Sequence, residues 1–219
     1  TRRRWRGRAP GGAGPSGRPG VPAGRLAIPQ GDWPELAGRL LALRGVTDAA
    51  TASAFLGKPG PQPDASALPD IDIAIDRLAR AVSDGESVAV YGDFDVDGVT
   101  SAAQLSEALS ALGAAPVPYI PDRFSEGYGL NVGAIEALQR TGATLLVTAD
   151  CGTSSIDEVA RARELGMDVI ILDHHTVPPD LPDATALVNP RVSPTARRGA
   201  APGGLLELAT AGLAFHVAS

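Results

Sequence analysis

Three aspartates at alternate positions follow a short apolar run near the middle of the chain. The run, 88–91, has the pattern of a short buried strand, and Asp93, Asp95 and Asp97 come directly after it. Carboxylates this close repel one another by about 1 kcal/mol or more per pair, even in a high effective dielectric. Either one of them takes up a proton or a cation lies between them. The sequence therefore predicts half of a divalent-metal site in this loop.

Other groups with ligand chemistry also follow apolar runs. They are Asp150, then Asp173, His174 and His175, and in a third loop Asp122, Arg123 and Glu126. Because ligands of open parallel sheets bind beyond the carboxyl ends of the strands, we expect these side chains to share one rim. Mixed carboxylate and imidazole ligands favour manganese or magnesium over a thiolate-rich zinc site. Two such ions about 4 Å apart are suited to in-line displacement at phosphorus.

The segments that would position these groups alternate between strand and helix patterns. Strands are predicted at 88–91, 117–120, 144–148, 169–172 and 186–188, and helices at 99–112, 132–140 and 155–165. Such alternation predicts an α/β domain with a parallel, five-stranded sheet covered by helices on both faces. The order of the strands does not follow from the sequence.

The part of the chain before residue 85 has a different character. Residues 1–31 contain seven arginines and no acidic residue, with abundant Gly and Pro, and we expect a disordered basic tail. Residues 32–84 are predicted to form a small segment of three helices, interrupted by a Pro/Gly-rich linker at 57–63. The main domain is then 85–219.

Composition restricts the classes of function. The single cysteine, Cys151, excludes an internal disulfide and is typical of a reducing compartment, so we expect a cytoplasmic protein. No apolar run approaches the length of about 20 residues that crosses a bilayer. Outside the tail, 12 basic and 25 acidic residues give a formal charge of −13. That charge disfavours non-specific duplex binding and is compatible with an enzyme whose metals supply positive charge.

Other interpretations of the same residues fit less well. The aspartate loop matches the start of an EF-hand, but Gln104 stands where that loop needs a bidentate glutamate. It also resembles the nucleophile loop of haloacid-dehalogenase phosphatases, whose later lysine has no counterpart because the only lysine, Lys58, lies upstream. Asp93 or Asp173 taken alone could be a helix cap or bond within its loop. Cys151 is better explained as a small buried residue than as a nucleophile.

Taken together, four motifs resemble the DHH phosphoesterase family, and within it the exonucleases specific for single-stranded DNA. They are YGDFDVDGVTS at 91–101, PDRFSEGYGL at 121–130, VTADCGTSS at 147–155 and DHH at 173–175. The resemblance implies hydrolysis of phosphodiester bonds from the 5′ end of single-stranded DNA, in repair and recombination. It also implies two manganese or magnesium ions in the full-length enzyme, with a metal-bound water as nucleophile.

The resemblance also assigns roles by position. It implies that the metal ligands are Asp95, Asp97, Asp150 and His174, with Asp95 and Asp150 touching both ions. It places His175 beside the scissile phosphate, so that His175 and Asp150 carry the catalysis. Asp93 and Asp173 would hold the ligands in orientation, and Arg123 would contact a phosphate of the substrate.

The chain departs from the family pattern at several places. Tyr91 stands where some DHH pyrophosphatases have a metal-binding histidine, and TARRGAAPGG at 195–204 alters the usual spacing. The family's last metal-binding aspartate lies beyond the helix that here ends the chain. We therefore expect an N-terminal catalytic part, truncated at its C-terminal end, without the DHH-associated domain and the oligonucleotide-binding fold.

Three further functions stay open at this point. The substrate could be nanoRNA or a small nucleotide. The chain could be a non-catalytic relative that binds DNA or a protein partner. It could also bind metal without turnover.

Overall fold

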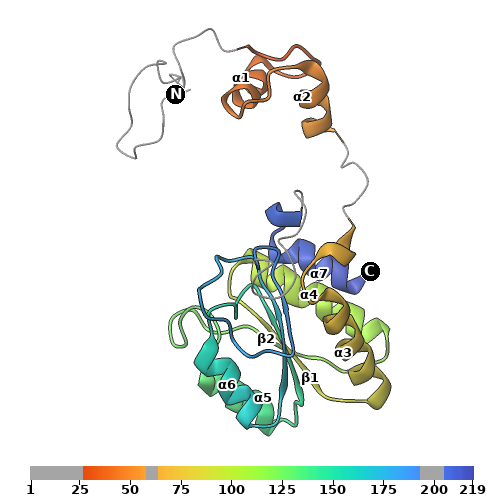
Figure 1. Ribbon diagram of the computed structural model, residues 1–219, viewed down its shortest axis with the longest axis vertical. Helices are drawn as coiled ribbons and strands as arrows, with labels where there is room; N and C mark the ends of the chain where they lie inside the picture. The colour runs from red at the N-terminus through yellow and green to blue at the C-terminus, as the bar shows by residue number, and fades with distance from the viewer. Residues whose placement is uncertain (1–26, 58–63, 193–204) are drawn as a thin grey trace, which may run out of the picture. The chain divides into compact units, whose positions relative to one another are not determined.

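The computed structural model describes residues 27–57, 64–192 and 205–219, and the chain divides into two compact units, Thr1–Gln62 and Pro63–Ser219 (Figure 1). Most of the predicted tail, nearly all of the predicted linker and the insert at 195–204 lie outside the described residues. No helix in the described ranges is long and apolar enough to cross a membrane.

The first unit contains two short helices, α1 (Glu35–Leu43) and α2 (Ala49–Leu56). Asp48 caps α2, because its carboxylate accepts hydrogen bonds from the backbone N–H of Thr51 at 2.9 Å and from its hydroxyl at 2.8 Å. None of the predicted site residues lies in this unit.

The second unit is built on a five-stranded sheet in which every neighbouring pair is parallel. The strands are β1 (Val88–Gly92), β2 (Val117–Tyr119), β3 (Leu145–Ala149), β4 (Asp168–Leu172) and β5 (Ala186–Val188), in the order β2-β1-β3-β4-β5. The predicted fold class is confirmed. The chain leaves β1 toward one edge of the sheet and returns to place β3 on the other side of β1, so the winding direction switches between β1 and β3.

Helices cover both faces of the sheet (Figure 1). One apolar core joins the sheet to α3 (Ile71–Asp84), α4 (Val96–Ala111) and α7 (Thr210–Ala218), together with the short 3-10 helices η1 (Ala65–Ala67) and η2 (Leu205–Glu207). The other core joins it to α5 (Val132–Arg140) and α6 (Ile156–Glu164). Along β1 the side chains alternate between the two cores, as a strand buried on both faces requires.

The helix α3 packs in the same compact unit as the sheet, and the two compact units meet at residues 62 and 63. The helix predicted at 99–112 begins at Val96, because Asp95 caps it and starts the first turn three residues earlier. That shift places Asp97 inside the first turn of α4 rather than in a free loop.

A buried arginine holds together the edge of the sheet where the strands begin. Arg77 on α3 forms ion pairs with Glu86 at 2.7 Å and with Asp168 at 2.6 Å, and only 6% of its surface is exposed. The hydrogen bonds to Glu86, and then those to Asp168, outweigh burial and raise the pKa of the Arg77 guanidinium. The same contacts with Arg77 lower the pKa of Glu86.

Candidate metal centre

Three aspartates leave the sheet side by side, one after each of three neighbouring strands. Asp93, Asp150 and Asp173 directly follow β1, β3 and β4, whose last residues are paired with one another across the sheet. Their backbone N–H groups donate to carbonyls of the adjacent strands at 3.1, 2.9 and 3.1 Å, respectively. All three side chains are buried. The predicted meeting of acidic groups at one rim is therefore present for these three strands.

Asp93 is the most unusual of the three. Its side chain is fully buried, and neither carboxylate oxygen has a hydrogen-bond partner within 27–57, 64–192 or 205–219. An unsatisfied buried polar group costs about 1–3 kcal/mol, and more when it is charged. Asp93, Asp95 and Asp150 each offer an oxygen, and these atoms lie within 4.8 Å of one another. We call these three residues the acidic group.

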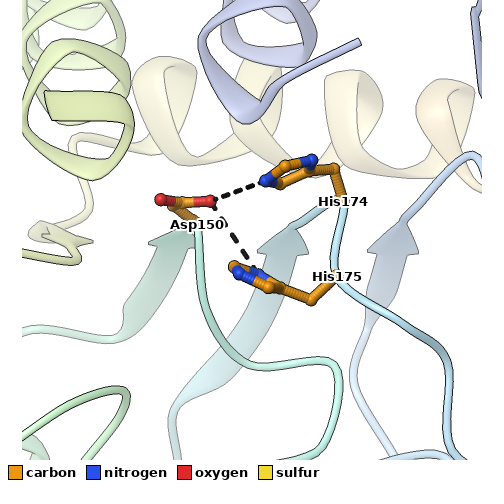
Figure 2. A group of neighbouring side chains, drawn as sticks. All are labelled: Asp150, His174 and His175. Carbon is orange, nitrogen blue, oxygen red and sulfur yellow. Dashed lines mark ion pairs between the residues drawn. The ribbon is translucent and has the colours of Figure 1, made fainter. Parts of the chain in front are cut away.

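A second set of candidate ligands shares Asp150. Figure 2 shows that the side chains of His174 and His175 point toward the carboxylate of Asp150. The Oδ1 atom of Asp150 is 3.4 Å from Nε2 of His174 and 3.9 Å from Nδ1 of His175. We call these three residues the histidine group. The same Nε2 atom of His174 is also 3.5 Å from Oδ2 of Asp97.

Asp150 is held in a conformation and a charge environment that few aspartates adopt. Its φ of 69° lies in the left-handed region, which costs an ordinary residue on the order of 1–3 kcal/mol. Burial, and then the charges of Asp97 and Asp95, raise the pKa of Asp150 to about 7, against the opposing effects of Thr210 and His175. A cation beside Asp150 would favour the charged carboxylate and so oppose that shift.

Asp173 orients the two histidines. Its Oδ1 accepts hydrogen bonds from the backbone N–H of His174 at 2.7 Å and of His175 at 3.1 Å, and lies 2.7 Å from Nδ1 of His175. Burial opposes the charged form of each group. The hydrogen bonds from Thr153 and His175 outweigh burial at Asp173 and lower its pKa. The contact with Asp173 outweighs burial at His175 and raises its pKa. The loop-bonding interpretation of Asp173 therefore agrees with the structure, whereas Asp93 makes no such bond.

Two buried polar residues behind the histidines were not predicted. Asn189 directly follows β5, and its amide nitrogen lies 3.0 Å from the carbonyl of His175 and 3.0 Å from the hydroxyl of Thr153. Thr153 in turn donates its backbone N–H to Asp173. The only signal for Asn189 was its place at the end of a predicted strand.

The first turn of α4 lies tightly against the aspartate loop. Oδ1 of Asp95 accepts from the backbone N–H of Asp97 at 2.9 Å and of Gly98 at 3.2 Å. A Cβ atom at Gly98 would lie 2.4 Å from backbone atoms of Asp93, so only glycine fits there. A strand precedes this loop, which excludes the EF-hand alternative.

The first turn of α7 lies against the same carboxylates. The backbone N–H groups of Thr210 and Ala211 donate to the two oxygens of Asp97 at 2.9 and 2.8 Å. The hydroxyl of Thr210 donates to Oδ1 of Asp150 at 3.0 Å. Thr210 is fully buried and was not predicted from the sequence.

Arg123 lies beside the site rather than among the acidic residues. Its guanidinium carbon is 5.2 Å from the centre of the Phe94 ring, which packs edge-on against Tyr128 at 6.1 Å. The hydroxyl of Tyr128 lies 3.1 Å from Nε2 of His175. Arg123 is therefore connected to the histidine group through two aromatic rings, and Tyr128 joins the residues that the sequence did not single out.

The donors present fit divalent cations. A buried carboxylate without partners, a shared Asp150 and imidazole nitrogens form a set of oxygen and nitrogen ligands without thiolate. Such ligands suit manganese or magnesium. By these distances Asp95 belongs to the acidic group alone, whereas Asp150 belongs to both groups.

Comparison with known sequences agrees with this chemistry. Residues 87–219 match the model of the DHH family, N-terminal domain. The chain is 41% identical to the single-stranded-DNA-specific exonuclease RecJ of Bacillus subtilis over 157 residues, which are 71% of this chain and 20% of that protein. It is 40% identical to RecJ of Salmonella typhimurium over 162 residues, or 74% of this chain and 28% of that protein. The chain thus spans between 20% and 28% of the length of these relatives.

Solved structures give the same result. An exonuclease RecJ bound to manganese superposes with a TM-score of 0.61 and 32% identity, covering 69% of this chain and 37% of that one. RecJ of Thermus thermophilus in complex with Mn²⁺ gives a TM-score of 0.55 and 27% identity, covering 82% of this chain and 25% of the other.

Proposed function

The chain belongs to the DHH family, and from this premise we propose that it is a metal-dependent phosphodiester hydrolase acting on single-stranded DNA from the 5′ end. One observation carries the proposal: Asp93 is fully buried next to Asp95 and Asp150, and no residue that the structure describes forms a hydrogen bond with either of its carboxylate oxygens. That arrangement is unfavourable without a cation. The RecJ relatives, and the RecJ structures solved with manganese, support the choice of substrate and metal.

The proposed ligands form two sets, one for each ion, and the second set differs from the histidine group in having Asp97 in place of His175. Asp93, Asp95 and Asp150 would hold one divalent ion, manganese or magnesium. Asp97, Asp150 and His174 would hold the other. From the family resemblance, Asp93 is expected to orient the ligands. We propose that it is a ligand itself, because it forms no hydrogen bond with any described ligand that it could orient. When bound, the ions supply positive charge to the phosphoryl oxygens and acidify a water molecule.

The remaining residues bind and orient the substrate. His175, held by Asp173 through Nδ1 at 2.7 Å, presents Nε2 toward the side where Tyr128 now contacts it. In the proposed reaction Nε2 donates to the scissile phosphate and stabilises the charge that develops on its oxygens. Arg123, close to that side through Phe94, binds a neighbouring phosphate of the strand. We propose that residues 85–219 form the catalytic domain and that α3, which precedes them, packs against its sheet.

The test is cleavage of single-stranded oligonucleotides by the 219-residue chain in manganese. We expect products from the 5′ end, no cleavage of a blunt duplex, and no cleavage in excess chelator. Asp150→Ala is expected to abolish cleavage, while the exposed Asp76→Asn on α3 serves as the matched control. Turnover that survives the chelator would refute the proposal. Faster turnover of a dinucleotide than of an oligonucleotide would replace it with a small-nucleotide phosphodiesterase.

A further inference from the structure

A threonine at the start of α7 reaches the carboxylates of the metal centre. Thr210 is fully buried and begins a nine-residue helix whose inward side chains, Leu213 and Ala214, belong to the apolar core. The helix α7 therefore packs against the apolar core through residues about one turn after Thr210. The hydroxyl of Thr210 instead donates a hydrogen bond to an acceptor in the site.

The first turn of α7 donates hydrogen bonds to the two carboxylates that are proposed as ligands of the second ion. The Thr210 hydroxyl donates to Asp150 at 3.0 Å, and the backbone N–H groups of Thr210 and Ala211 donate to the two oxygens of Asp97 at 2.9 and 2.8 Å. Two donors, one on each oxygen, fix the plane of the Asp97 carboxylate. One donor on Oδ1 of Asp150 limits rotation of that carboxylate.

We propose that Thr210 is a positioning residue, which holds Asp150 with its hydroxyl while the first turn of α7 holds Asp97, so that both carboxylates face the ion they share with His174. The inference rests on the proposed metal centre. Threonine suits the task because its branched side chain has few rotamers, so the hydroxyl loses little freedom when it bonds. Groups that orient metal ligands typically change metal affinity by about 10–100-fold when removed.

The experiment is calorimetric titration of the 219-residue chain with manganese, without DNA. Thr210→Val keeps the shape of the side chain and removes the hydroxyl, and we expect one of two sites to weaken by about 10–100-fold. Thr210→Ser keeps the hydroxyl and should bind nearly as tightly as the parent chain. Thr141→Val is the matched control, because the Thr141 hydroxyl bonds to the carbonyl of Leu138 on α5, outside the site.

The outcomes separate the two proposals. A parent chain that binds no manganese overturns the metal centre and the role of Thr210 together. Binding by the parent with unchanged binding by Thr210→Val overturns only the role of Thr210. If Thr210→Val loses the circular dichroism of the parent, Thr210→Ser decides: weak binding by a folded serine variant shows that the hydroxyl is not what positions Asp150.

Discussion

Replacing Asp93 by asparagine should have opposite effects on stability without and with metal. In the metal-free chain the carboxylate of Asp93 is fully buried, and neither oxygen has a hydrogen-bond partner among the described residues. Asparagine has nearly the same shape and no charge, but its amide would also lack partners there. Because an unsatisfied buried group costs more when it is charged, we expect Asp93→Asn to raise the free energy of unfolding by the excess cost of the charge, on the order of 1 kcal/mol.

Manganese should remove this advantage. A ligand at 100 times its dissociation constant stabilises the protein to which it binds by about 2.7 kcal/mol. If asparagine weakens that site by about 100-fold, the variant gains only about 0.4 kcal/mol at the same concentration. The difference of about 2.3 kcal/mol exceeds the gain seen without metal, so the variant should be the less stable of the two chains in manganese.

The assay is urea unfolding of both chains in chelator and in excess manganese. Circular dichroism should be the probe, because Trp5 and Trp33 are the two tryptophans and both lie in the unit that lacks the sheet. Asp76→Asn on the exposed side of α3 is the control and should change neither value. An Asp93→Asn variant that is less stable than the parent in chelator would refute the reasoning, since the carboxylate would then have a favourable partner other than a cation.

Two further predictions concern pH and the opposite edge of the sheet. The pKa of Asp150 is raised to about 7 from 3.8, so the folded metal-free chain keeps a proton that the unfolded chain releases. The stability from this group is complete below about pH 4 and falls as pH rises to about 7, by at most about 1.4 kcal/mol per pH unit. The unfolding free energy of Asp150→Asn minus that of the parent should rise over this range and level off above it; a flat difference contradicts the shift. Arg77→Met should lower the free energy of unfolding in urea by about 1–3 kcal/mol. The loss is smaller than for a fully buried ion pair, because Asp168 is half exposed. Arg80→Met on the same helix should lower the free energy of unfolding by under about 0.5 kcal/mol.

The sequence predicted the strands because each is a short apolar run bounded by polar or glycine residues. It also predicted that their ends would bring Asp150 and the histidines to the aspartate loop, since this follows from parallel pairing alone. The strand order could not be predicted, and it is the order that puts β3 between β1 and β4. Asp150 belongs to both groups of ligands because its strand lies in the middle of the three.

The residues that the sequence missed have one feature in common. Thr210 lies 60 residues from Asp150 in the chain, and Tyr128 lies 47 residues from His175. A threonine at a helix start and a tyrosine in a loop are ordinary in those positions, so residue type gave no signal. The proposal that Asp93 is a ligand could not come from the sequence for another reason: whether a buried carboxylate has hydrogen-bond partners depends on packing that only coordinates reveal.

The matched ends of β1, β3 and β4 have a consequence for how the site tolerates change. Adjacent strands of a sheet lie about 4.8 Å apart, close to the separation of about 3.5–4 Å between the ions of two-metal sites. In the proposed metal centre the backbone ladder would therefore set the distance between the two ions. A change in loop length around the rim would leave that distance unchanged, whereas a one-residue slip of β3 would carry Asp150 away from both sets of ligands at once.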